Sequence, residues 1–290
     1  RVLFRSLYYL AFAGVVNVIL NLFFVIVCHL GVAGVALASM ISQFISAFLI
    51  LRALLTGKEK YCLRLSEIRF DKRKAVGILQ IGIPSAFQYS LFAFANLFVQ
   101  SSVNSFDHVL VEGNSAAANA DPLVYDMMAA FYTACSSFIA QNFGARKKKR
   151  ILQTYLICLF YSFITSLVLG VGIYLARYPF LYLFTSDKAV VEAGITRLSI
   201  MALSYSASAF MDASIAASRG LGKTAVPTFV VVMGSCVFRI IWIYTIFAYF
   251  HTIQSLYILY VFSWGITAIA ENIYFFHVYR HTLTEKKELC

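Results

Sequence analysis

The chain has 290 residues, of which 61% are hydrophobic and 13% are charged, and its mean hydropathy is +0.78. About a quarter of the residues in ordinary soluble domains are charged, so this composition excludes that class. The 27 Phe and 18 Tyr exclude a disordered chain. The formal charge of +11 could suit nucleic acid, but so apolar a chain has no soluble scaffold on which to expose a basic face. We therefore expect a membrane protein with no nucleic-acid partner.

Eight apolar stretches are each long enough to cross a bilayer, which requires about 20 residues. The stretches lack strand alternation, and lipid admits only helices or closed barrels, so the sequence predicts an all-α polytopic bundle. The fourth and sixth spans are diluted by Ser, Thr, Asn and Asp, which indicates that these two helices do not face lipid all round. The expected spans are residues 7–28, 31–55, 76–103, 117–141, 151–176, 190–218, 225–250 and 253–279.

Lys and Arg residues are concentrated between alternate helices. Of the 24, all but four fall at the N-terminus, in alternate interhelical segments or in the C-terminal tail. The four exceptions are Arg177, Lys188 and Arg197 on the other side of the membrane and Arg239 inside the seventh span. Cytoplasmic loops carry the excess of positive charge. This distribution predicts a multi-pass protein of the cell membrane with both termini in the cytoplasm.

The polar segment 56–75 divides the chain, and we expect it to be a cytoplasmic linker that lies along the membrane as an interfacial helix. An internal repeat supports the division, because aligning His29 with His251 also aligns Asn17 with Arg239 and the first two spans with the last two. Residues 7–55 are then the last two helices of a first lobe. Residues 76–279 form a six-helix second lobe, and residues 280–290 are a cytoplasmic tail. Duplicated six-helix lobes are a transporter arrangement.

Three motifs in order suggest a family: GIPSAFQYSLFAFANLFVQSSVNSF from Gly82, SSFIAQNFGARKKKRI from Ser136 and MDASIAASRGLGKTAVP from Met211. Together with the apolar hairpin from Asn17, they resemble the multidrug and toxic compound extrusion (MATE) family. The resemblance implies two six-helix lobes that rock about a central cavity. It also implies antiport in which organic cations or drug-like small molecules leave in exchange for H⁺ or Na⁺. No other cofactor is expected, and the partners are this small molecule and membrane lipid around a monomer.

The resemblance implies that four helices of the first lobe are missing. Arg1–Ser6 stands where the family has a cytoplasmic loop, and it does not resemble that loop. We therefore hypothesise a truncated gene product with a non-native leader at residues 1–6, the alternative being a divergent native loop. Half a cavity would lie open to lipid, so we expect the 290-residue chain to be inactive on its own.

Polar residues on the third and fourth spans could line the transport pathway. Asp126, Thr133, Ser137 and Gln141 recur at helical spacing and therefore share one face of the fourth span. Such a face must look into protein or a wet cavity, because a polar group in hydrocarbon costs several kcal/mol. The alternative is hydrogen bonding between helices, which is a common role for Ser and Thr.

The third span carries a stripe of amides at Gln88, Asn96, Gln100 and Asn104. Amides can bind a ligand by donating and accepting hydrogen bonds without carrying charge, or they can fasten one helix to another. Phe92 stands within this span where the well-known sodium-coupled branch of the family has a glutamate. The coupling ion is therefore not assigned by the resemblance.

Asp212, with Ser208 one turn deeper, is the candidate coupling residue of the sixth span. An ionised Asp in mid-bilayer costs about 2.5–3.5 kcal/mol, so something should offset its charge. The candidates are a proton, a bound cation such as Na⁺, or Arg239, and the last would make Asp212 part of a structural ion pair. Competition between the coupling ion and the drug for this one acid would link the two flows.

The remaining polar positions are expected to be structural or solvated. Asp107, Glu112, Asp121 and Asp187 lie near outer helix ends, where solvated charge is the usual interpretation. Two cytoplasmic turns are interpreted as topological anchors, and they comprise Gln141, Asn142 and Gly144 in one and Arg219, Gly220 and Gly222 in the other.

Two other functions are alternatives. A flippase for lipid-linked oligosaccharides shares the two-lobe fold but would favour a basic cavity, and Arg239 is the one cation expected inside a span. An intramembrane enzyme is the less favoured alternative, since the sequence has no HExxH, paired-Asp or GxSxG motif. The six cysteines form no CxxC pair, so no metal site is expected apart from Na⁺ near Asp212.

Overall fold

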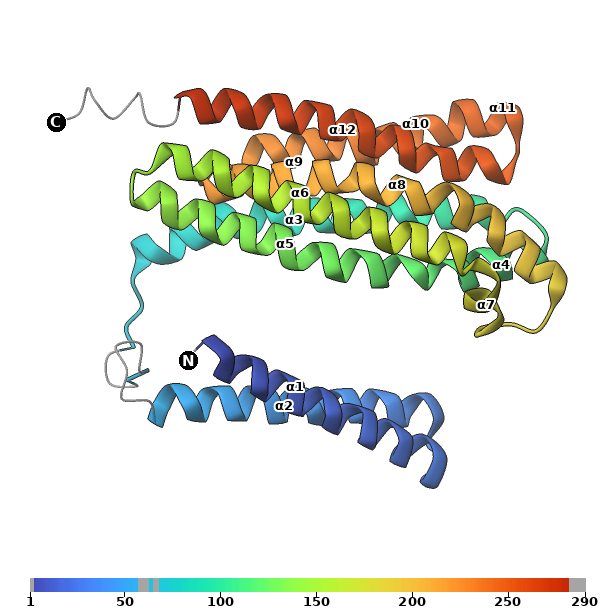
Figure 1. The fold of residues 1–290 in the computed structure, drawn as a ribbon, viewed down its shortest axis with the longest axis horizontal. Coiled ribbons are helices and arrows are strands. Elements are labelled where there is room, and N and C mark those ends of the chain that lie inside the picture. Colours follow the sequence, from blue (N-terminus) through green and yellow to red (C-terminus); the bar gives the residue numbers. More distant parts are fainter. Residues whose placement is uncertain (1–2, 57–62, 65–67, 282–290) are drawn as a thin grey trace. The chain divides into compact units, whose positions relative to one another are not determined.

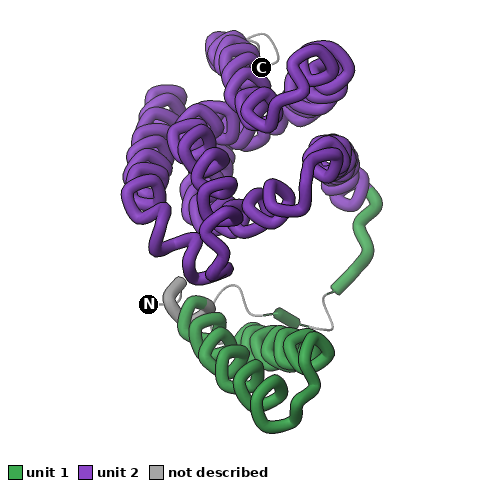
Figure 2. The backbone as a smooth tube through the Cα atoms, turned by 90° about the vertical axis from the view of Figure 1, so that its right-hand side faces the viewer, with its two compact units in different colours: residues 1–72 green, residues 73–290 purple. Residues whose placement is uncertain are grey.

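The computed structural model describes residues 3–56, 63–64 and 68–281, and most of these residues lie in helices (Figure 1). Among these residues there is no strand, and eight helical stretches are long and apolar enough to cross a bilayer. The predicted all-α membrane class is thus confirmed. The chain divides into two units, residues 1–72 and 73–290, each of which is described by itself (Figure 2). The side chains of the expected leader Arg1–Ser6 and most of the tail 280–290 lie outside the described residues.

Unit 1 is a helical hairpin of α1 (Leu3–Leu22), a π-helical turn (Phe23–Val27) and α2 (Gly31–Thr56). Polar groups fasten the two helices, since Asn17 Nδ2 donates to Ser42 Oγ at 3.1 Å. Gly34 also lets the helix backbones approach, because a Cβ there would come within 2.9 Å of the Phe24 side chain. Most other side chains of the hairpin are exposed and apolar, as expected of helices that face lipid.

Unit 2 is a bundle in which α8 (Lys188–Gly220) packs against α4, α5, α6 and α12. Its other elements in chain order are α3 (Lys72–Val103), α4 (His108–Ala118), α5 (Ala120–Gly144), α6 (Lys148–Leu175), α7 (Arg177–Tyr182), α9 (Ala225–Val231), a π-helical turn (Val232–Val237), α10 (Phe238–Trp242), a second π-helical turn (Ile243–Phe247), α11 (Ala248–Phe250) and α12 (Ile253–His281).

Small residues explain the central position of α8. Gly170 of α6 lies so close to α8 that a Cβ would collide with the carbonyl of Ala202. A Cβ on Gly220 would come within 2.7 Å of the Ser136 carbonyl oxygen on α5. Small residues let helix backbones approach closely inside a membrane. The Ser- and Ala-rich sequence of α8 therefore reflects burial, and the prediction that this span does not face lipid all round agrees with the structure.

The fourth span differs from its prediction. It begins earlier, at α4, where the Asp107 side chain caps the helix by accepting from the Leu110 N–H at 2.9 Å. A break at Asn119 separates α4 from α5. The short helix α7 was not expected. The expected interfacial helix at 56–74 falls partly on residues outside the description, and Leu63, Arg64 and residues 68–71 are not helical.

The two hairpins at the ends of the chain share an unusual turn. His29 and His251 both adopt positive φ, at 53° and 47°, and each lies two residues before the next helix, at Gly31 and Ile253. A π-helical turn precedes each histidine. L-residues seldom adopt this left-handed conformation, so its recurrence at aligned positions supports the internal repeat.

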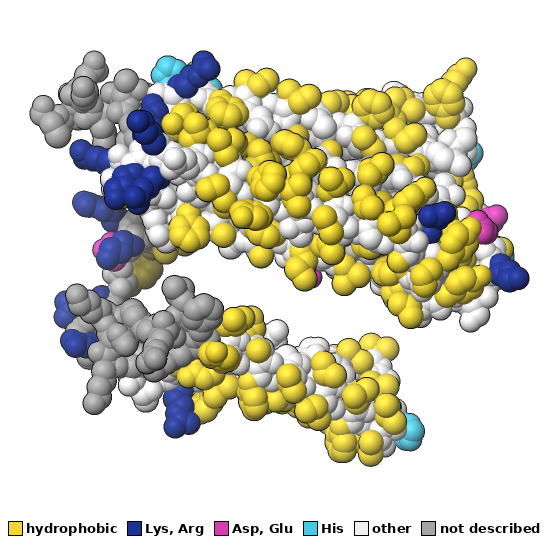
Figure 3. All heavy atoms as spheres, in the orientation of Figure 1, with side chains coloured by type: hydrophobic (Ala, Val, Ile, Leu, Met, Phe, Trp, Pro, Cys, Tyr) yellow, Lys and Arg dark blue, Asp and Glu magenta, His cyan; other side chains and the backbone are white. Residues whose placement is uncertain are grey.

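Lys and Arg side chains gather at one end of unit 2, which we call the basic end (Figure 3). There α3 begins, α5 meets α6, and α12 finishes (Figure 1). Apolar side chains cover the flanks between this end and the opposite one (Figure 3). The residues that define the basic end are Arg73, Lys74, Arg146–Arg150, Lys223 and Arg280.

Candidate functional site

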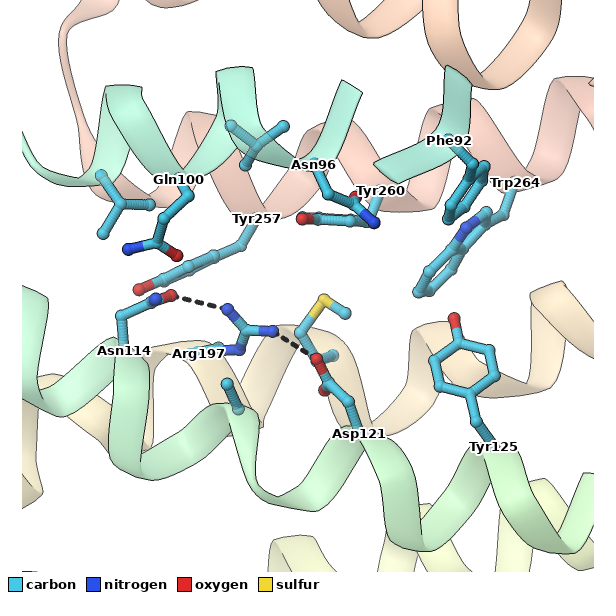
Figure 4. A pocket seen from close by; sticks show the side chains of 14 residues that line it. Phe92, Asn96, Gln100, Asn114, Asp121, Tyr125, Arg197, Tyr257, Tyr260 and Trp264 are labelled. Atoms are coloured by element: carbon cyan, nitrogen blue, oxygen red, sulfur yellow. Dashed lines mark hydrogen bonds and ion pairs between the residues drawn. The ribbon is translucent and has the colours of Figure 1, made fainter. Parts of the chain in front are cut away.

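Two cavities in unit 2 share one wall of aromatic side chains. The Arg197 cavity has a volume of about 260 Å³ and is lined by α3, α4, α5, α8 and α12. The Asp212 cavity has a volume of about 180 Å³ and is lined by α3, α5, α8, α9 and α12. Phe92, Tyr125 and Trp264 line both cavities. Figure 4 shows these three rings gathered on one side of the Arg197 cavity.

An ion pair crosses the floor of the Arg197 cavity. Arg197 is 7% exposed, and its Nη2 donates to Asp121 Oδ2 at 2.6 Å while its Nη1 donates to Asn114 Oδ1 at 2.6 Å (Figure 4). The hydroxyl of Tyr205 donates to the other oxygen of Asp121. Asp121 was expected to be a solvated charge, and Arg197 was expected outside the spans. Both expectations are wrong. Arg197 lies inside unit 2 on α8, and its buried guanidinium requires an anionic partner, which Asp121 supplies.

Arg239 of α10 is fully buried behind the same cavity. Its Nη1 donates to Asn96 Oδ1 at 2.7 Å and its Nε donates to Ser263 Oγ at 3.4 Å. The guanidinium lies 4.6 Å from the ring centres of both Phe92 and Tyr260. None of the described carboxylates pairs with it, so the hypothesised ion pair between Asp212 and Arg239 is wrong.

Asp212 lines the smaller cavity together with Gln88 and Arg219. Arg219 Nη2 donates to Gln88 Oε1 at 2.9 Å, and its guanidinium lies 5.9 Å from the Tyr89 ring. Asp212 itself forms no hydrogen bond or ion pair with a described residue, although Arg219 is close enough to act on it electrostatically. Arg219 was interpreted as a turn residue. It instead supplies the cationic side of this cavity.

Glu271 is a buried acid that escaped prediction. It lies in α12 with 0% exposure, and neither carboxylate oxygen has a hydrogen-bond partner among the described residues. Arg219 acts on it electrostatically, as it does on Asp212. The signal was present in the sequence, because an acid inside an apolar span is a functional candidate by default.

Of the other predicted site residues, some line a cavity and some do not. Asn96 and Gln100 line the Arg197 cavity, whereas Asn104 lies just beyond α3 and accepts from Gln100 Nε2 at 3.0 Å. Ser208 is fully buried, donates to the Tyr205 carbonyl at 2.9 Å and lines neither cavity. The predicted face of α5 is exposed and lines neither cavity, and its members are Asp126, Thr133, Ser137 and Gln141.

The predicted turn residues lie at helix ends. Asn142 Nδ2 donates to the Phe138 carbonyl at 2.9 Å in the last turn of α5, which ends at Gly144. Gly220 ends α8, and Gly222 has a φ of 76°, which glycine adopts without the steric cost of a Cβ. These positions shape the turns at the basic end.

Comparison with known proteins identifies the family. A MatE family match covers residues 84–245, more than half of the chain. The chain belongs to the MatE family. This match includes most of α3, all of α4 to α10, and both Asp212 and Arg239.

Similar proteins agree with this MatE assignment. The chain is 30% identical over 144 residues to the probable multidrug resistance protein YpnP of Bacillus subtilis, covering 49% of this chain and 32% of that protein. It is 24% identical over 204 residues to the probable multidrug resistance protein NorM of Thermotoga maritima, covering 69% of this chain and 43% of that protein.

A solved MOP superfamily transporter from Pyrococcus furiosus has the same fold, with a TM-score of 0.85 at 19% identity. The match covers 93% of this chain and 61% of that chain. The MatE chain thus spans less than two thirds of the length of each of these proteins.

Proposed function

We propose that this MatE chain is part of a cation-coupled antiporter that exports amphipathic organic cations and other drug-like molecules. In this proposal residues 76–279 are a complete lobe, residues 7–55 belong to the other lobe, and the lobes rock about a central cavity. The observation that carries the proposal is Asp212, a carboxylate that lines a cavity inside a transmembrane bundle without an ion pair to a described residue.

The walls of the Asp212 cavity suit an organic cation. The rings of Tyr89, Phe92, Tyr125, Tyr132 and Trp264 line it. Aromatic faces attract cations, and an acid among them adds a full charge. A flat cationic drug would bury its rings against these faces and direct its charge toward Asp212. The two relatives named above are both called probable multidrug resistance proteins, which supports a drug-like substrate.

Coupling follows if one carboxylate serves two cations in turn. When H⁺ or Na⁺ binds Asp212, the negative charge that holds the drug is neutralised and the drug is released. Glu271 provides a second acid in α12, and Arg219 acts electrostatically on both acids. The inward movement of one charge gains about 2.3 kcal/mol per 100 mV of membrane potential.

Efflux of ethidium from vesicles tests the proposal, with proton and sodium gradients applied separately. The complete natural gene should be expressed as wild type, as Asp212→Asn and as the control Glu112→Gln. Glu112 is exposed and lines neither cavity. We expect Asp212→Asn to abolish efflux and Glu112→Gln to retain it. Equal efflux from wild type and a correctly inserted Asp212→Asn would contradict the role of Asp212, and no efflux from wild type under either gradient would contradict the antiporter.

We further propose that the protein lies in the cell membrane as a monomer, in contact with membrane lipid, and with its basic end in the cytoplasm. The clustered Lys and Arg of unit 2 support this orientation. Labelling of single cysteines introduced at Arg146 and at Asp187 with an impermeant maleimide tests it in intact cells. Labelling at position 187 but not at 146 is expected, and the reverse would refute the orientation.

A further inference from the structure

Arg239 is a permanent charge enclosed among neutral groups. An arginine does not release its proton in a protein, so burial cannot neutralise it. Arg239 has 0% exposure, and its contacts are the Asn96 amide, the Ser263 hydroxyl and the faces of Phe92 and Tyr260. Its Nη2 has no hydrogen-bond acceptor among the described residues. The guanidinium fork is therefore only partly satisfied.

The contrast with Arg197 shows what Arg239 lacks. Arg197 is also buried, but Asp121 balances its charge at 2.6 Å. An unpaired buried charge is costly, and neutral amides and rings offset only part of that cost. Arg197 and Asp121 balance each other, so Arg239 is the buried guanidinium beside this cavity that has no carboxylate partner among the described residues.

The position of Arg239 connects it to that cavity. Three of its contacts, Phe92, Asn96 and Tyr260, are themselves lining residues of the Arg197 cavity. Figure 4 shows Asn96 and Tyr260 side by side on the wall that faces the pair formed by Arg197 and Asp121. Asn96 is partly exposed, so its amide separates Nη1 of Arg239 from the cavity. π-helical turns on both sides of α10 mark the same stretch of helix, and such turns are frequent at functional sites.

We propose that Arg239 is the anion-binding residue of the Arg197 cavity, and that this cavity takes ligands that carry a carboxylate on an aromatic body. The carboxylate takes the place of the Asn96 amide oxygen and accepts from both Nη1 and Nη2, the paired geometry that a guanidinium fork favours. The aromatic body packs against Phe92, Tyr260 and Trp264. This inference rests on the proposed transport function, since it adds an anionic group to the description of the substrate.

A matched pair of dyes tests the proposal. A carboxyl-rhodamine and its methyl ester share the same cationic ring system and differ only in the carboxylate. Binding to the product of the complete natural gene, held in lipid nanodiscs, is measured by fluorescence polarisation. We expect wild type to bind the acid at least about tenfold more tightly than the ester, the factor typical of one charge-assisted hydrogen bond. Arg239→Gln should remove that preference, and the control Arg177→Gln, which changes a cation of α7 that lines neither cavity, should keep it.

Two further variants cover the case in which Arg239→Gln fails to fold. Arg239→Lys keeps the charge but not the fork and should reduce the preference, whereas Asn96→Ala frees Nη1 and should increase it. If both dyes bind and their ratio is the same in wild type and in these variants, the anion site is refuted while the transport proposal stands. If neither dye binds and wild type shows no ethidium efflux, both proposals are refuted.

Discussion

The ion pair between Arg197 and Asp121 offers the sharpest test of how unit 2 is stabilised. Asp121→Asn keeps the shape of the side chain but removes its charge, and it weakens the acceptor for both Arg197 Nη2 and the Tyr205 hydroxyl. Breaking a buried ion pair costs about 3–5 kcal/mol because the remaining charge is left unpaired. The Asp121 side chain is 26% exposed, so solvent screens part of this interaction. We therefore expect a loss of about 2–3 kcal/mol in the free energy of unfolding.

The assay is equilibrium unfolding in mixed micelles at increasing dodecyl sulfate, followed by tryptophan fluorescence. The double variant Asp121→Leu with Arg197→Met removes both charges, so it should be more stable than Asp121→Asn alone even though it changes two residues. Asp126→Asn, at an exposed position on the same helix, should stay within about 0.5 kcal/mol of wild type. If Asp121→Asn is as stable as wild type, or if the double variant is the less stable of the two, the unpaired-charge reasoning is refuted.

Three other predictions follow from described features. Glu271→Gln should remove a protonated-carboxyl band from the infrared spectrum, because ionising an enclosed carboxyl with no hydrogen-bond partner among the described residues is costly. Gly170→Leu should lower stability by about 3 kcal/mol in a thermal unfolding assay, because its side chain would collide with the Ala202 carbonyl on α8. His29→Gly should raise stability by about 1 kcal/mol by relieving the left-handed conformation, and His251→Gly should gain less.

Each of these predictions has its own control. Gly172 lies on the same helix as Gly170 and has open space around it, so equal losses from Leu at the two positions would contradict the packing argument. His251 stacks on Phe106 with ring centres 5.7 Å apart, a contact that glycine would lose, whereas His29 makes no ring contact with a described residue. A destabilised His29→Gly would refute the strain assigned to that turn. An infrared spectrum unchanged by Glu271→Gln would exclude a proton on Glu271.

Hydropathy was sufficient to predict the helices because the bilayer imposes length and composition on each span separately. The dilution of α8 by small polar residues also indicated its burial, since Ser and Ala allow the close approach that centres α8 in the bundle. The break at Asn119 was not predictable in this way. Both α4 and α5 pack against α8 on either side of this break, and such packing leaves mean hydropathy unchanged.

Side-chain pairing limited the prediction of the site. Asp212, Gln88 and Asn96 line cavities, as a polar residue in a span suggests. Which faces of a helix meet lipid, protein or a cavity is decided by tertiary packing, and the exposed face of α5 looked equally suitable in sequence. Arg197 and Asp121 are joined only through the crossing of α8 with α5. No residue spacing along the chain predicts such a contact.

The aromatic wall common to the two cavities makes their contents interdependent. The side chains of Phe92, Tyr125 and Trp264 each form part of the wall of both cavities. A molecule that displaces these rings on entering one cavity must reduce the volume of the other cavity. Binding in one cavity therefore weakens binding in the other, and by thermodynamic linkage the coupling free energy is the same in both directions. The same three rings would therefore couple the anion proposed near Arg239 to the cation proposed at Asp212.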